Sequence, residues 1–164
     1  MKTLYIVRHA KASWDFPELP DVERPIIEKG INNTKKIVNE LNNRNVKVDL
    51  IISSHAKRAH DTAKIIATGI YYPVDKIEVS KGIYQVDVDD MFDLISDVQD
   101  DIHSLMIVGH NPTFTQIANY FLQEEIDILT TSGVISINFE TKNWAGIKKA
   151  KHKINFILFP KMLN

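Results

Sequence analysis

The 164-residue chain contains no cysteine. Disulfide bonds, thiolate nucleophiles and cysteine-ligated zinc sites are therefore excluded. The sequence also lacks any apolar run that approaches the roughly 20 residues of a membrane span. Its first residues enter a short apolar segment and then charged residues, without the long apolar stretch of a signal peptide. We therefore expect a cytoplasmic protein that does not enter a membrane.

Net charge of either sign is almost absent. Twenty Lys and Arg residues stand against 21 Asp and Glu residues, which leaves a formal net charge of −1. A balance of this kind provides no overall field that would attract nucleic acid. Hydrophobic residues make up 44% and charged residues 25%, as in ordinary globular domains. Because no repeat, linker or low-complexity segment divides the chain, we expect one domain over residues 1–164 and a monomer.

Continuous apolar runs bounded by turn residues predict strands that are covered on both faces. The clearest runs lie at 3–8, 49–53 and 104–109, and a weaker strand is expected at 76–80. Two further strands close the chain, at 134–139 and 153–159. The short connection between these last two contains a glycine, which favours an antiparallel pair at the edge of a sheet.

Helical periodicity fills the gaps between the strands. Apolar residues recur at helical spacing in the segments 28–43, 56–67, 91–98 and 114–122. Asn111 suits the N-cap of the last helix, and Pro112 suits its first position. Alternating strands and helices predict a three-layer α/β sandwich, with a mainly parallel sheet of about six strands between helices on both faces. The long irregular segment 10–24 follows the first strand directly and should border a functional site.

Two of the apolar strands run directly into a histidine. The first continues as Arg8-His9, and the other as Gly109-His110, followed by Asn111. Ligands of open α/β sheets bind at the carboxyl ends of the strands. Two imidazoles and a guanidinium at that edge would form a small basic pocket. A planar guanidinium can bind two phosphoryl oxygens at once, so the pocket would suit a phosphoryl group.

A second guanidinium, that of Arg58, falls in the first turn of the helix after the strand at 49–53, where backbone N–H groups favour an anion. Each feature alone has an ordinary explanation. Arg8-His9 can be structural, Arg58 a solvated helix residue and His110 a turn residue. Three such features at the ends of parallel strands are much less expected by chance. Arginines close to His9 would lower its pKa and keep its imidazole neutral and nucleophilic.

These segments carry a resemblance to a known family. The chain resembles the histidine phosphatase (phosphoglycerate mutase-like) superfamily, and within it the small branch of SixA-like phosphohistidine phosphatases. The matching segments are Val7-Arg8-His9-Ala10-Lys11, Trp14, Arg24-Pro25 with Gly30, Arg58-Ala59 with Thr62-Ala63, Val108-Gly109-His110-Asn111-Pro112 and Thr131-Ser132-Gly133. The resemblance runs nearly from end to end and implies the phosphoglycerate mutase-like fold.

The resemblance also implies roles for individual residues. His9 would be the nucleophile and would form a phosphohistidine intermediate, which water then hydrolyses. Arg8, Arg58 and a protonated His110, together with Asn111, would bind the phosphate. Two residues are assigned to the rim of the substrate site, Lys11 and Trp14. No cofactor and no metal is expected, since the arginines and His110 supply the positive charge.

The sequence departs from the larger members of the superfamily at the acidic proton donor. The comparable region, 82–87, offers Gln85, which cannot donate a proton as an acid. Asp87, Asp89 and Asp90 are better explained as caps of the third helix. A weak P–N bond to imidazole needs less fixed general acid than an ester bond does. We therefore favour protein phosphohistidine as the substrate, which makes a phosphorylated protein the expected partner.

Two other functions stay open at this point: hydrolysis of small phosphate monoesters, and a non-catalytic phosphate-binding module on the same fold. The remaining histidines are scattered along the chain and do not suggest a metal site; they are His55, His60, His103 and His152. The basic stretch 142–153 has two readings, either a solvated loop or a docking site for an acidic partner.

Overall fold

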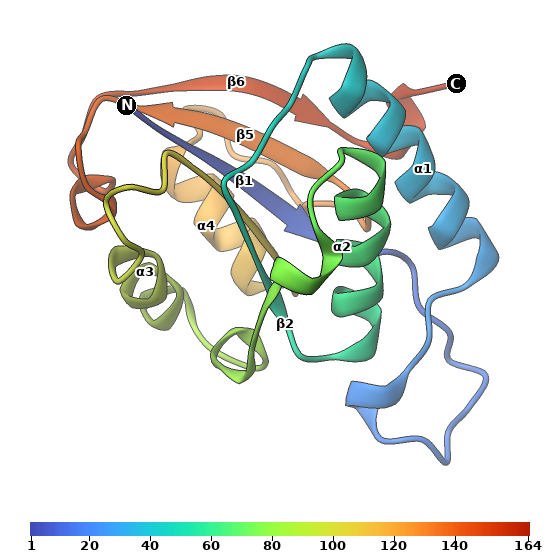
Figure 1. Ribbon diagram of the computed structural model, residues 1–164. Helices are drawn as coiled ribbons and strands as arrows, with labels where there is room; N and C mark the ends of the chain where they lie inside the picture. The colour runs from blue at the N-terminus through green and yellow to red at the C-terminus, as the bar shows by residue number, and fades with distance from the viewer.

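The computed structural model describes residues 1–164 as a six-stranded sheet with helices on both faces (Figure 1). The strands have the order β3-β2-β4-β1-β5-β6 across the sheet. Only β5 runs against its neighbours, so the sheet is mainly parallel, as predicted. The strands are β1 (Lys2–Arg8), β2 (Leu50–Ser54), β3 (Glu78–Ser80), β4 (Ser104–Gly109), β5 (Val134–Phe139) and β6 (His152–Leu158). The helices are α1 (Glu28–Asn43), α2 (Lys57–Gly69), α3 (Val88–Ser96) and α4 (Thr113–Phe121).

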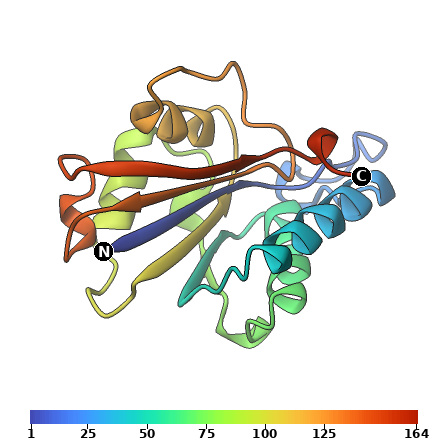
Figure 2. The same ribbon diagram turned by 90° about the horizontal axis from the view of Figure 1, so that it is seen from above.

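The helices form two pairs on opposite sides of the sheet (Figure 2). Successive side chains of a strand point to opposite faces of the sheet, so a strand that is apolar throughout makes both faces of the sheet apolar. In β1, Leu4 and Ile6 pack into the core beneath α3 and α4, whereas Tyr5 and Val7 pack beneath α1 and α2. The same alternation divides β4, so each central strand contributes to two cores. The expected three-layer α/β sandwich is confirmed.

The element boundaries differ from the predicted ones by a few residues. The weak strand expected at 76–80 begins only at Glu78, because residues 74–76 form a 3-10 turn. The capping role of Asp87 is confirmed, since its carboxylate accepts the N–H of Asp90 in a reciprocal capping box. The start of α4 is shifted: Pro112 takes the N-cap position, and the Asn111 side chain accepts the N–H of Thr115 from one residue further back. Such shifts are usual at helix ends.

The long segment after β1 is a structured loop at the carboxyl end of that strand (Figure 1). Ala12 forms an isolated bridge with Ile26, and residues 21–23 form a 3-10 turn. The loop packs closely against the start of α1 at Gly30, where an added Cβ would lie 2.6 Å from the carbonyl oxygen of Lys11. Glycine at this position therefore allows the loop to pass, and the loop returns over the ends of the strands.

Candidate active site

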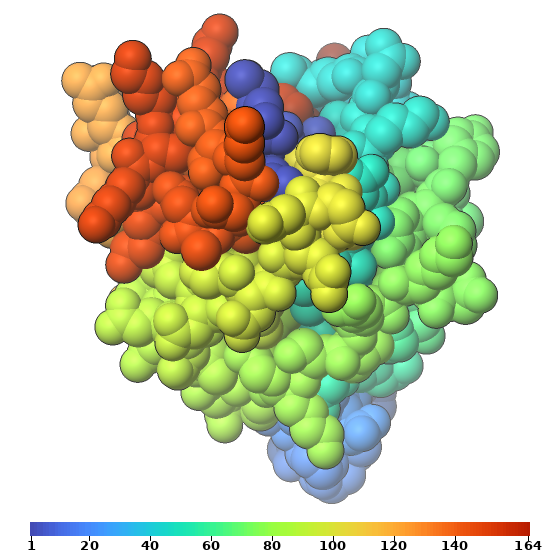
Figure 3. Space-filling model, turned by 60° about the vertical axis from the view of Figure 1, so that its left-hand side comes forward, coloured from blue at the N-terminus to red at the C-terminus, as the bar shows by residue number.

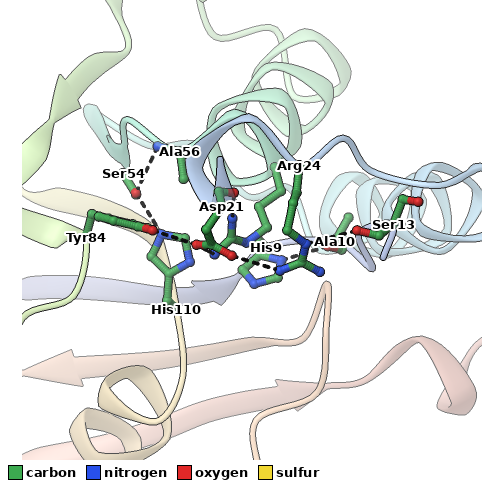
Figure 4. Close-up of polar contacts among 10 residues, drawn as sticks. His9, Ala10, Ser13, Asp21, Arg24, Ser54, Ala56, Tyr84 and His110 are labelled. Atoms are coloured by element: carbon green, nitrogen blue, oxygen red, sulfur yellow. Dashed lines mark hydrogen bonds and ion pairs between the residues drawn. The ribbon is translucent and has the colours of Figure 1, made fainter. Parts of the chain in front are cut away.

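The two histidine corners predicted from the sequence lie side by side. β1 and β4 are parallel neighbours, with Arg8 opposite Gly109 in the register. The N–H of His9 donates to the carbonyl of Gly109 over 3.0 Å. The rings of His9 and His110 are 5.2 Å apart, centroid to centroid. Figure 4 shows both imidazoles in one site beside Asp21 and Tyr84.

His9 is held in the state that a nucleophile requires. Its ring is buried, and Nδ1 lies 2.7 Å from the carbonyl oxygen of Ala10. A carbonyl only accepts, so Nδ1 carries the proton and Nε2 keeps its lone pair. Burial, followed by the neighbouring His110 and the positive charges of Arg58 and Arg8, lowers the pKa of His9 to about 3 despite the hydrogen bond to Ala10. The imidazole is therefore neutral across the physiological range.

His110 is oriented by a short hydrogen-bond chain from the end of β2. The N–H of Ala56 donates to Ser54 Oγ over 3.2 Å, and Ser54 Oγ lies 2.7 Å from His110 Nε2. The Ser54 hydroxyl has no other acceptor, so we assign it as the donor to Nε2, and the proton of His110 then lies on Nδ1. Burial and the charge of Arg58 lower the pKa of His110 to about 4. The sequence analysis expected a protonated His110; the neutral ring already presents a donor at Nδ1.

Arg58 is not the solvated helix residue that the alternative reading described. It is 6% exposed, and both terminal nitrogens of its guanidinium bind Asp21. Nη1 donates to the backbone carbonyl of Asp21 over 2.7 Å, and Nη2 donates to its carboxylate over 3.0 Å. Arg8 is anchored similarly at one end, since Nη1 donates to the carbonyl of Leu129 over 3.1 Å.

Three N–H groups of the site have no partner. Arg8 Nε, Arg58 Nε and His110 Nδ1 are buried and make no hydrogen bond. Buried donors are nearly always paired in folded proteins, and each unpaired donor costs about 1–3 kcal/mol. They lie on the side chains that surround His9, and two belong to cations. This arrangement fits an anion with several acceptor oxygens, such as a phosphoryl group.

Sequence reasoning missed Asp21 and Tyr84. The carboxylate of Asp21 accepts the hydroxyl of Tyr84 over 2.6 Å and also pairs with Arg24 over 3.2 Å. Burial would raise the pKa of Asp21, but these hydrogen bonds and those from Arg58 outweigh it and lower the pKa to about 2. Asp21 is thus an ionised acceptor. The only signal for Asp21 in the sequence was its position in a long loop after Arg8-His9. That signal did not distinguish Asp21 from the other residues of the loop.

A threonine joins the backbone that follows His9 to α2. The N–H of Ala10 donates to Thr62 Oγ1 over 2.8 Å, and that hydroxyl donates to the carbonyl of Arg58 over 2.7 Å. Thr62 is fully buried. It entered the sequence analysis only as part of the resemblance, and its contacts now give it a physical role. It fixes the backbone after His9 against the turn that carries Arg58.

Of the other candidate residues, Asn111 lines the hollow beside His110, and Trp14 is linked to the site only through Arg24. The amide of Asn111 donates to the carbonyl of Leu129 over 2.9 Å, so it holds the same loop as Arg8 does. The ring of Trp14 is 79% exposed and stacks beneath the guanidinium of Arg24 at 3.4 Å. Lys11 is exposed, and its ammonium makes no hydrogen bond or ion pair. These positions are compatible with a rim around the site.

The remaining histidines are dispersed. Of them, only His55 lies near the site, with its ring 5.2 Å from that of Tyr84. No group of three His, Asp or Glu side chains converges as a set of metal ligands. In the basic stretch, the ammonium of Lys148 lies over the rings of Phe92 and Tyr120, away from the site. No helix is long and apolar enough to cross a membrane.

Two hollows of similar size lie on different parts of the molecule, and only one of them adjoins the site. One, of about 600 Å³, adjoins the site and is lined by Arg58, His110, Asp21 and Tyr84 among others. The other, of about 640 Å³, lies among β2, β3 and the segment before β4, on the face shown in Figure 3. None of the candidate site residues lines this second hollow. The site chemistry is therefore concentrated in the first.

The family follows from a match over more than half of the chain. The family model described as "Histidine phosphatase superfamily (branch 1)" matches residues 4–100. The chain belongs to the histidine phosphatase superfamily. The matched segment contains Arg8, His9, Asp21 and Arg58. His110 lies beyond it, so the placement of His110 in the site rests on the structure.

Comparison with solved structures supports the same fold. The protein histidine phosphatase SixA in complex with tungstate has a TM-score of 0.83 and 20% identity, over 99% of both chains. A candidate phosphohistidine phosphatase SixA from Agrobacterium tumefaciens has a TM-score of 0.77 and 24% identity, over 96% of this chain and 97% of that one. An uncharacterised protein of Mycobacterium tuberculosis is 27% identical over 147 residues, which cover 89% of each chain. The SixA-like fold expected from the sequence is confirmed.

Proposed function

We propose that this protein is a phosphatase that works through a phosphohistidine enzyme intermediate. The observation that carries the proposal is the set of unpaired N–H groups on Arg8, Arg58 and His110, buried around a neutral His9. Charge-assisted hydrogen bonds from these groups would bind the phosphoryl oxygens and strengthen as negative charge spreads over them in the transition state.

In the first step, the Nε2 lone pair of His9 attacks phosphorus while the bond from phosphorus to the leaving group breaks. The leaving group departs with the electron pair of that bond and is protonated. In the second step, water attacks the phosphorus, the bond to Nε2 breaks, and inorganic phosphate leaves. Arg8 and Arg58 hold the transferring group in line through both steps. The proton on His9 Nδ1 stays bonded to the carbonyl of Ala10 throughout.

Protein phosphohistidine is the substrate that we propose. The nearest carboxylate of the site, that of Asp21, is ionised because its pKa is about 2, so it is not positioned as a general acid. Tyr84 holds its proton firmly, because burial and the hydrogen bond to Asp21 raise its pKa. A substrate whose leaving group is a good one without strong acid catalysis fits this site. An imidazole leaving a P–N bond is such a group.

The direct test is to trap the intermediate. Brief incubation with a radiolabelled phosphohistidine protein, followed by alkaline denaturation, should leave acid-labile label on the wild-type chain. The His9→Ala variant should trap none and should lose at least about 10³-fold in turnover while keeping its fold. Label that survives acid, or undiminished turnover in His9→Ala, would refute the proposed nucleophile.

A second comparison tests the substrate. The wild-type enzyme should hydrolyse the phosphohistidine protein with a higher kcat/KM than sugar phosphates. Faster turnover of the sugar phosphates would instead favour a monoesterase. An absence of turnover on both, together with retained binding of tungstate, would favour a non-catalytic phosphate-binding module.

A further inference from the structure

The hollow beside the phosphate site has a chemical character of its own. It measures about 600 Å³ and extends from Arg58 and His110 to the starts of α3 and α4. Its lining includes two carboxylates, those of Asp21 and Asp87, and the side-chain amides of Gln85, Asn111 and Gln116. Because Arg58 and His110 belong to this lining, a substrate whose phosphoryl group they bind can extend its other part into the hollow.

The charge of the hollow is negative away from the phosphate. Arg58 is the only cationic side chain that lines it, and both of its terminal nitrogens are already bonded to Asp21. Asp87 is exposed at the N-cap of α3 and has no cationic partner. The carboxylate of Asp21 is compensated by Arg58 and by Arg24, which pairs with it from outside the hollow, so Asp87 is the carboxylate of the lining whose charge has no partner.

Arg58 also links the hollow to the proposed phosphate site. Its side chain is 6% exposed, and its Nε–H remains unpaired. That N–H can take a phosphoryl oxygen while Asp21 holds the other end of the guanidinium. The leaving group of the same substrate then meets Asp21, Asp87 and the amides, which offer acceptors to N–H or O–H donors.

We propose that this hollow is a leaving-group subsite that selects cationic or donor-rich leaving groups and disfavours anionic ones, with Asp87 as its charged determinant. The proposal rests on the proposed function, because it requires the phosphoryl group to lie among Arg8, Arg58 and His110. A protonated imidazole or an amine would be favoured here. A leaving group with its own carboxylate would be repelled by Asp87.

The test uses two ligands that differ in one charged group. Para-aminomethylphenylphosphonate and para-carboxyphenylphosphonate share the phosphonate and the ring, and neither can be hydrolysed. Calorimetric titration of the wild-type protein should give about tenfold tighter binding of the aminomethyl compound at low ionic strength. The preference should shrink in concentrated salt, because these charges are exposed.

Two variants should both lower this preference, one by removing a negative charge and the other by adding a positive charge. Asp87→Asn removes one carboxylate but keeps a residue that caps helices well, so the preference should fall about threefold while the fold is retained. Gln116→Lys adds a cation on the exposed face of α4 and should lower the preference further by strengthening binding of the carboxylate ligand. Asp89→Asn, two residues further along in α3 and outside the hollow, is the matched control and should change nothing.

Equal binding of the two phosphonates by the wild type would overturn the subsite, and so would an Asp87→Asn preference equal to that of the wild type. Failure of the proposed function has a different signature. In that case neither phosphonate nor tungstate binds in a manner sensitive to Arg58→Ala, and no label is trapped on His9. Tight binding of tungstate with no discrimination between the phosphonates would refute the subsite and leave the proposed phosphatase standing.

Discussion

The protein buries positive charge at both ends of its central strand, in two different ways. At the amino end of β1, Lys2 is 1% exposed, and its ammonium donates to the carbonyls of Asp100 and Ile102. It also lies 5.7 Å from the ring centre of Trp144. At the carboxyl end, Arg8 and Arg58 are anchored by some of their nitrogens, but each keeps a buried Nε–H unpaired. The ammonium of Lys2 finds its partners within the protein, whereas Arg8 and Arg58 each keep a donor that is free for a ligand.

This contrast distinguishes a cation with a structural role, Lys2, from two cations that we propose to bind a ligand, Arg8 and Arg58. Lys2 is tolerated because its buried ammonium donates to two carbonyls, of which that of Ile102 also accepts the indole N–H of Trp144. No such need explains the unpaired donors around His9, and close guanidinium groups repel each other, as the lowered pKa of Arg8 reflects after the effect of burial. We therefore expect that replacing Lys2 lowers the stability of the protein and that replacing Arg8 or Arg58 raises it. Mutations at the two ends of the strand can test both expectations.

The largest effect is expected from Arg58→Ala. Removing the guanidinium should lower kcat/KM by about 10²–10³-fold, because a contact that strengthens in the transition state is lost. Arg8→Ala should behave similarly. Arg58→Lys keeps the charge but not the Nε–H and should recover only part of the rate. Steady-state kinetics with thermal unfolding as a control will show the loss; near-normal rates in both alanine variants would contradict the pocket.

Lys2→Met should produce the opposite pattern. The methionine fills a similar volume but leaves the carbonyl of Asp100 without its side-chain donor and the carbonyl of Ile102 with only the indole N–H of Trp144, so stability should fall by about 1–3 kcal/mol. Turnover at a temperature where the variant is folded should stay within about twofold of wild type, since the site is distant. Urea unfolding measures the first quantity. Lys153→Met on exposed β6 is the control, and an equal loss there would remove the distinction.

The neutral histidines should make the protein sensitive to acid. The pKa of His110 is about 4 in the fold against 6.5 ordinarily, so the unfolded chain binds more protons between these values. Stability therefore falls as the pH drops from 6.5 toward 4, and His9 acts in the same direction. His110→Gln should lose less stability over that range, by on the order of 1 kcal/mol. Unfolding curves at the two pH values test this, and identical losses in both proteins would refute it.

A smaller effect is expected at Asp21, which positions Arg58. Asp21→Asn keeps the backbone carbonyl that binds Nη1 but removes the charge that binds Nη2, so kcat/KM should fall about tenfold. The melting temperature should change little, because the carboxylate is 44% exposed. Titration with tungstate provides the decisive readout: weaker binding supports positioning, and tighter binding means that the carboxylate competes for Arg58. Asp15→Asn in the same loop is the control.

Much of the architecture was predictable because apolar patterning is local. The buried runs of β1, β2 and β4 and the amphipathic helices between them are enough to specify a parallel sheet covered on both faces. The start of α4 was less predictable. Asn111 and Pro112 both suit helix starts, and the choice between them depended on where the side chain of Asn111 finds Leu129 and Thr115, contacts made by a distant segment and by the helix itself.

The sequence by itself determined which groups meet: Arg8-His9 and Gly109-His110 end neighbouring parallel strands, and Arg58 begins the helix between them in the chain. Strand ends of a parallel sheet share one edge, so their meeting follows from connectivity. Only the tertiary structure decided how these groups are held. Asp21 returns to Arg58 from 37 positions away, and Ser54 sets the tautomer of His110 across 56 positions. Such contacts depend on loop paths and side-chain packing, which no local pattern in the chain encodes.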